Sequence, residues 1–174
     1  MNAAHLHLAL IHFPIAGLVL ACLGLLYAAL RKDTAVQRAA LVFLTVAGLS
    51  AAPAYYSGGY AEEIAEDLQG VSEDNIHAHE EAAEAALAAS LAAGVLSAGL
   101  LVLFRKKDLP RSALAGALAV ALVAAGLTGR AGNLGGAIRH PEIEMSAPQG
   151  PGETGEAAGE QEKGGEKETG GEDD

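Results

Sequence analysis

Six histidines are the residues of this chain best suited to chemistry. They form two short runs and one isolated position, at His5, His7, His12, His77, His79 and His140. An imidazole changes its charge near neutral pH, carries protons, and binds transition metals in its neutral form. A single histidine near a membrane surface more commonly only solvates or hydrogen-bonds. The set therefore gains meaning only if the fold brings its members together.

Other reactive patterns are missing from the sequence. The single cysteine, Cys22, lies inside an apolar block, so it has no disulfide partner and we expect it to pack. No Cys-x-x-Cys-His motif occurs, which excludes covalent attachment of a c-type haem. Nothing matches a nucleophile paired with a base, or a nucleic-acid-binding surface. We therefore expect neither a hydrolytic enzyme nor a nucleic-acid partner.

The elements that must position the histidines are long apolar blocks. The chain is 51% hydrophobic but only 4% aromatic, and its Ala, Leu, Val and Gly residues are concentrated in four blocks. About 20 apolar residues cross the hydrocarbon of a bilayer as a helix, and these blocks lack the alternation of barrel strands. The sequence predicts an all-α membrane protein, a four-helix bundle in residues 1–145 with helices at about 8–30, 36–57, 74–104 and 112–128.

The basic residues indicate how the bundle is oriented. They lie between the first and second helices and between the third and fourth, at Arg31, Lys32, Arg38, Arg105, Lys106, Lys107 and Arg111. The segment joining the second and third helices is acidic and carries no base. By the positive-inside rule the basic loops are cytoplasmic. Both termini, the acidic loop and every histidine are then expected on the outer side, the periplasm of a bacterial inner membrane.

The helix ends near the outer side are also predicted from the pattern. Ile64, Leu68 and Val71 recur at helical spacing and Gly70 offers a stop, which predicts a short amphipathic helix on the outer surface. Ser72 is followed by two acids, so we expect it to cap a third helix that projects above the bilayer.

Counting along each helix compares the heights of the histidines. At about 1.5 Å per residue from the basic loops, His12 lies about 28 Å up, at the edge of the hydrocarbon. His7 and His5 lie about 36 and 39 Å up, and His79 lies about 39 Å up. His79 is therefore level with His5 or His7 and could act in a pair with either of them.

His12 is the deepest histidine and the one least able to keep its water. His140 follows Gly132, Gly135 and Gly136, which are expected to break the fourth helix and to let the chain return across the bundle towards His12. An off-level pair of His12 with His79 stays open, because Pro14 can bend the first helix.

Two motifs carry a resemblance to a known family. The segment His7-Leu8-Ala9-Leu10-Ile11-His12-Phe13-Pro14 and the segment Gly135-Gly136-Ala137-Ile138-Arg139-His140 resemble those of an uncharacterised family of bacterial four-helix predicted membrane proteins. The resemblance covers residues 5 to about 141. Members usually have a bulky apolar pair with Tyr before the second histidine and Gly after it, whereas Pro141 follows it here. The resemblance implies a candidate haem b carrier that accompanies cytochromes and respiratory genes.

The leading hypothesis is therefore a haem b-binding electron-transfer protein of a respiratory chain, with one or two haems at the outer face. Four-helix bundles build such sites from facing helices, and haem iron accepts two imidazoles. It would exchange electrons with a partner cytochrome or a quinone, as an electron-transfer subunit rather than a stand-alone enzyme. His12 is the first choice of ligand, Arg130 and Arg139 would meet the haem propionates or lipid headgroups, and the cofactor-binding candidates are His5, His7, His12, His79, His140, Arg130 and Arg139.

Two alternatives remain open at this point. The chain could be a non-catalytic membrane anchor or structural subunit of a larger complex. It could instead bind a metal through His77, Glu81 and Glu84, which share one face of the third helix, although these acids also suit a solvated first turn. Gly17, Gly48, Ser50, Gly94 and Ala98 could admit a flat macrocycle, but such residues more often let membrane helices pack.

The C-terminal segment differs from the bundle in composition. Residues 146–174 are rich in Gly and Glu, contain no large apolar residue, and account for most of the net charge of −11. Such a segment cannot bury enough surface to offset its ordering entropy. We expect it to be a disordered, solvated acidic tail.

Overall fold

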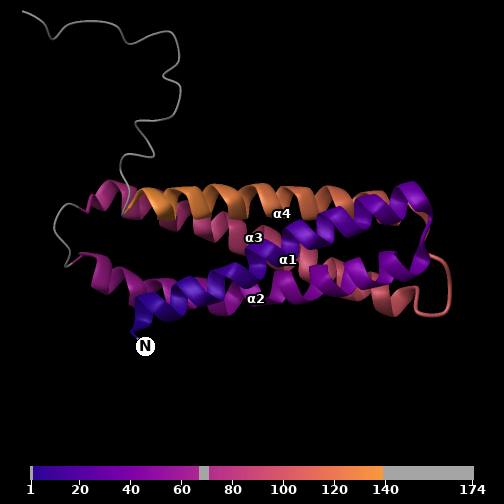
Figure 1. The fold of residues 1–174 in the computed structure, drawn as a ribbon, viewed down its shortest axis with the longest axis horizontal. Helices are drawn as coiled ribbons and strands as arrows, with labels where there is room; N and C mark the ends of the chain where they lie inside the picture. Colours follow the sequence, from indigo (N-terminus) through magenta and orange to yellow (C-terminus); the bar gives the residue numbers. More distant parts are fainter. Residues whose placement is uncertain (1, 67–70, 139–174) are drawn as a thin grey trace, which may run out of the picture.

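The computed structural model describes residues 2–66 and 71–138, and these residues form four long helices and no strand. The helices are α1 (Ala3–Arg31), α2 (Thr34–Glu66), α3 (Glu73–Leu103) and α4 (Arg111–Ala137). Each is long and apolar enough to cross a membrane. Figure 1 shows them lying along one long axis, with successive helices running in opposite directions. The predicted four-helix membrane architecture is confirmed.

The alternating directions give the bundle two chemically different ends. At one end α1 and α3 begin while α2 and α4 end; we call this the histidine end, because it carries His5, His7, His77 and His79. The opposite end is the basic end, and its exposed bases are Arg31, Lys32, Arg38, Arg105, Lys106, Lys107 and Arg111. Helices that follow one another in the chain are also neighbours in space, and α4 returns to α1.

Side chains and backbone conformation fix the tight turns at the helix ends. The Asn2 side chain accepts a hydrogen bond from the His5 backbone N–H at 2.9 Å and starts α1. Lys32 takes the left-handed conformation (φ 56°) that ends α1. The Asp33 carboxylate then accepts from the Ala35 N–H at 2.9 Å, which satisfies a free donor at the start of α2.

The start of α3 agrees with the prediction made from the sequence, whereas the end of α2 does not. Ser72 is the N-cap of α3, as predicted, with two acids in the first turn, although its side chain makes no capping bond. The prediction that the second helix stops near residue 57, before a separate surface helix, is wrong, because α2 is continuous to Glu66. The helix continues through Gly58 and Gly59, and His7 of α1 lies against Ser57 and Gly58 on this stretch. Leu68 and Gly70, invoked for the surface helix, lie outside the described residues.

The end of α4 also differs from the prediction. Gly132, Gly135 and Gly136 were expected to break the helix, but α4 runs through all three to Ala137. Glycine weakens a helix by only about 1 kcal/mol relative to alanine, and packing against α3 and α1 is enough to override that preference. His140 lies outside the described residues, so the expected return of the chain towards His12 does too.

The large core side chains are concentrated towards the basic end. The main hydrophobic cluster takes residues from all four helices and includes the fully buried Leu18, Leu25, Leu41 and Leu44. Towards the histidine end a second cluster involves α3 and α4 alone; its buried residues are all alanines, and the partly buried Leu127 and Leu134 pack against them. Figure 1 shows that here the start of α1 lies beside the end of α2, and the start of α3 beside the end of α4. The histidine end is therefore built from two helix pairs.

Glycines bring the middles of the helices into backbone contact. A Cβ on Gly48 of α2 would lie 2.4 Å from the Ser90 carbonyl oxygen and 2.7 Å from the Gly94 Cα of α3. A Cβ on Gly17 of α1 would lie 2.6 Å from the Ala47 Cβ of α2. These small residues let helices pack closely, which is the common use of glycine in membrane bundles. They leave no room here for a macrocycle.

Candidate functional site

His7 is held between α1 and α2. Its half-buried imidazole has Nδ1 at 3.1 Å from the Ala54 carbonyl oxygen and at 3.0 Å from the Ser57 hydroxyl. Ser57 is buried and its hydroxyl donates to the same Ala54 carbonyl at 2.7 Å. A carbonyl oxygen can only accept, so Nδ1 carries the proton in this arrangement. In the neutral ring the free lone pair is then on Nε2.

His79 is held in the same manner between α3 and α4. Its imidazole is also half-buried, and Nδ1 donates to the Ala131 carbonyl oxygen at 2.9 Å. Gly135, one turn further along α4, lies against the ring: a Cβ there would be 2.9 Å from Cε1. Gly58 lies against the His7 ring in a similar but less close contact, where a Cβ would lie 3.4 Å from Cε1. Both rings thus rest on small residues of a neighbouring helix.

The structure has these two histidines at the same end of the bundle. His7 belongs to the α1–α2 pair and His79 to the α3–α4 pair. Each ring uses Nδ1–H on a backbone carbonyl, which fixes the tautomer and the ring orientation, as second-shell bonds do for metal-binding histidines. Among the described residues, each ring therefore keeps its Nε2 without a hydrogen-bond partner, one on each helix pair.

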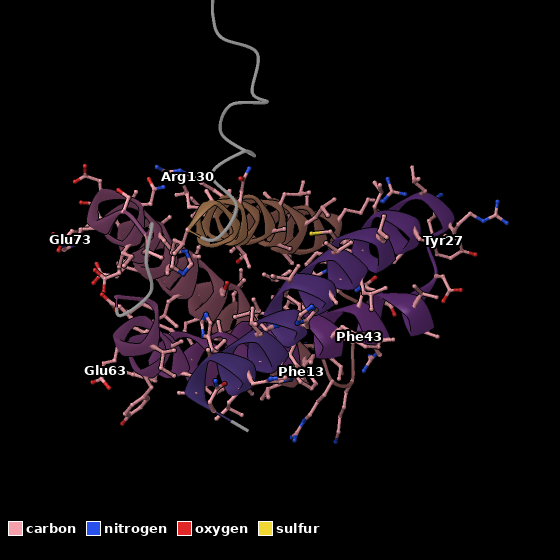
Figure 2. All side chains as sticks on the ribbon, turned by 60° about the vertical axis from the view of Figure 1, so that its left-hand side comes forward. Phe13, Tyr27, Phe43, Glu63, Glu73 and Arg130 are labelled. Carbon is pink, nitrogen blue, oxygen red and sulfur yellow. The ribbon has the colours of Figure 1, made fainter. Side chains whose placement is uncertain are left out.

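The other predicted ligands lie elsewhere. His12 is exposed, and its Nδ1 bonds to the carbonyl of Leu8 on its own helix rather than to a neighbour. His5 is exposed at the first turn of α1. His140 and Arg139 lie outside the described residues. Arg130 is exposed on α4, where Figure 2 shows its side chain at the surface of the bundle.

Carboxylates also lie at the histidine end, and their recorded partners are side chains other than His7 and His79. The exposed side chains of His77 and Glu80 pair at 3.4 Å, and Tyr55 donates to Glu84 at 3.3 Å. Across residues 2–66 and 71–138, no group of three or more His, Cys, Asp or Glu side chains could hold a metal ion. Figure 2 shows Glu63 and Glu73 at this same end, on α2 and α3. The acids give the histidine end a negative surface.

Apart from Gly135, which was assigned to a helix break, sequence reasoning did not single out the residues that position the two imidazoles. Ser57 and the carbonyls of Ala54 and Ala131 fix the ring nitrogens, while Gly58 and Gly135 make room for the rings. The run Ser57-Gly58-Gly59 at the end of α2 was the available signal, because consecutive small residues permit a side chain of another helix to approach the backbone.

Comparisons with known proteins place the chain in a family. Neither the curated proteins nor the solved structures contain a match. The profile of one family, described as predicted membrane protein (DUF2231), matches residues 3–140, which include all four helices and every histidine. The chain belongs to this family of predicted membrane proteins.

Proposed function

We propose that this protein is a haem b-binding electron-transfer protein of a bacterial respiratory chain, in which His7 and His79 would hold the haem iron. The observation that carries the proposal is the matched pair of Nδ1–H bonds to the Ala54 and Ala131 carbonyls. These bonds leave Nε2 of each ring free on two helix pairs that come together at one end of the bundle. Bound haem would supply one-electron transfer.

The residues around the pair fit such a cofactor in kind. The rings are half-buried among small side chains and backbone, so a ligand there would be partly shielded from water. Arg130 is a cation on α4 for a propionate, and Arg139 is a second candidate in the sequence. By the positive-inside rule the site faces the periplasm. Electrons would pass from there to a partner cytochrome or a membrane quinone.

This proposal changes the ligand assignment drawn from the sequence. His12 was the first choice because of its depth, but its ring is exposed and is bonded within its own helix. His7 and His79 are half-buried at the same end of the bundle, and each is bonded to a backbone carbonyl of a neighbouring helix. The haem hypothesis is therefore kept, with the pair of His79 and His7 that the heights along the helices also allowed, in place of a pair that includes His12.

The test is the haem content of variants of the full chain. Each protein is produced in haem-replete cells, purified in mild detergent and measured by its absorption spectrum and pyridine haemochrome content per chain. His7→Ala and His79→Ala should each abolish the low-spin spectrum. His77→Ala, two residues away on the same helix and exposed, is the matched control and should keep it.

The remaining outcomes separate the alternatives. Loss of haem in His12→Ala with a full spectrum in His7→Ala would restore the sequence-based assignment. A colourless wild-type protein would remove the electron-transfer function and favour the membrane anchor. Stoichiometric zinc, iron or copper in a haem-free preparation would favour a metal-binding protein instead.

A further inference from the structure

The basic end of the bundle contains a second candidate binding site, on the opposite side of the membrane from the histidine pair. It is a shallow groove between the start of α2 and the end of α3, closed by the segment that leads to α4. Its lining residues are Thr34, Gln37, Arg38, Leu41, Leu100, Leu101, Phe104, Lys107, Asp108 and Leu109. It combines an apolar floor with a charged rim.

The floor and the rim suit different parts of one molecule. Leu41 is buried, and Leu100, Leu101 and Phe104 are half-buried, so the floor presents hydrocarbon between two membrane helices. Arg38 and Lys107 stand exposed at the rim. Charged side chains of a membrane helix lie at the boundary with water, so the groove opens where lipid headgroups meet the acyl chains.

Arg38 is held in place and still has donors to offer. Its guanidinium donates to the Phe104, Arg105 and Lys107 carbonyl oxygens at 3.2, 3.3 and 3.4 Å, which fixes the turn after α3 against α2. A guanidinium has five N–H donors, so two remain for a ligand. A cation fixed by the fold and presenting free N–H groups is well suited to a phosphate oxygen.

The charge around the groove selects the sign of the ligand. Lys32, Lys106 and Arg111 are further exposed bases at the same end. Asp108 on the rim opposes them, whereas the Asp33 carboxylate is already occupied by backbone N–H groups at the start of α2. The local excess of bases favours an anionic headgroup and disfavours one that carries its own cation.

We propose that this groove binds one anionic phospholipid, with its phosphate at Arg38 and Lys107 and an acyl chain along Leu100 and Leu101. The occupant is a lipid rather than a free phosphate, because the floor between the rim residues is hydrocarbon that a soluble anion would leave uncovered. The proposal is independent of the haem hypothesis and of the direction in which the chain crosses the membrane.

The test measures lipid retention by the full chain. Delipidated protein in detergent is titrated with phosphatidylglycerol or phosphatidylcholine, and bound lipid is counted by native mass spectrometry. One phosphatidylglycerol per chain should bind more tightly than phosphatidylcholine, and Lys107→Gln should weaken that binding about fivefold. Lys107 is exposed, so the variant keeps the fold. Lys32→Gln removes the same charge outside the groove and should bind within about twofold of wild type.

Three results would overturn the proposal. Equal losses in Lys107→Gln and Lys32→Gln would mean that a diffuse basic collar attracts lipid without a site. Equal retention of the two lipids would remove the role of the rim charges. Displacement of the bound lipid by soluble glycerol phosphate would show that the groove recognises the phosphate alone.

Discussion

Gly135 of α4 lies so close to His79 of α3 that a Cβ on the glycine would stand 2.9 Å from the imidazole Cε1. Real Cβ atoms do not approach other heavy atoms this closely, so the ring occupies its place only because position 135 has no side chain. The same part of α4 provides the Ala131 carbonyl that accepts the Nδ1 proton. The position and tautomer of His79 therefore both depend on α4.

Gly135→Ala should weaken the binding of any ligand held by His7 and His79. The new methyl group must displace the imidazole from its acceptor, and overpacking of this kind costs about 1–3 kcal/mol, which weakens binding about tenfold. Haem content per chain after purification is the measurement. Gly129→Ala is the matched control, because a Cβ there meets nothing within 4 Å. Equal haem content in the two variants would show that the position of His79 is irrelevant to binding.

Gly48→Ala should separate α2 from α3 and destabilise the bundle. Its Cβ would lie 2.4 Å from the Ser90 carbonyl oxygen, and neither backbone can move without disturbing the packing. The expected loss is about 1–3 kcal/mol in the free energy of unfolding, measured by thermal or SDS titration in detergent. Gly99→Ala adds a methyl group in open space and should be neutral or slightly stabilising. Unchanged stability of Gly48→Ala would mean that the two helices do not touch there.

The orientation of the chain in the membrane can be read with reporter fusions. A reporter that is active only in the cytoplasm should work when fused after Lys107 and fail after Gly70 or Asp174. The reason is the concentration of bases in the two loops of the basic end and their absence from the acidic segment between α2 and α3. The opposite pattern would place the histidine end in the cytoplasm.

Truncation after Met145 should leave membrane insertion and any bound cofactor unchanged. Residues 146–174 contain no large apolar side chain with which to pack on the bundle. Membrane fractionation and haem content of the shortened chain are the measurements. A loss of cofactor on truncation would show that the acidic segment takes part in the site.

The four helices could be predicted from the sequence because a membrane span needs a long apolar block, and each block is present. The ends of α2 and α4 could not, since they depend on glycines whose conformation is decided by neighbours. Gly58 and Gly135 remain helical where they face an imidazole of another helix. From the conformational preference of glycine alone, the helices would be predicted to end at these residues.

The heights of the histidines along the helices could be predicted by counting residues. The direction in which each side chain points around its helix axis was not considered in that prediction. Counting residues set His79 level with His5 or His7, and the structure has His7 and His79 at the same end of the bundle. His12 follows His7 by a number of residues that rotates it about 140° around the axis of α1. The two side chains of one helix therefore cannot face the same neighbours, and His12 is exposed.

The uneven core makes one end of the bundle stiff and the other compliant. Leucines from α1 and α2 pack in a cluster with residues of all four helices near the basic end, whereas the buried residues of the second cluster, within the α3–α4 pair at the histidine end, are all alanines. Local opening is easiest where few large apolar groups are buried, so amide exchange should be faster at the histidine end. A bulky ligand could then enter between the α1–α2 pair and the α3–α4 pair after all four helices are inserted in the membrane. Ligand binding would be the last step of folding, after the core near the basic end has packed.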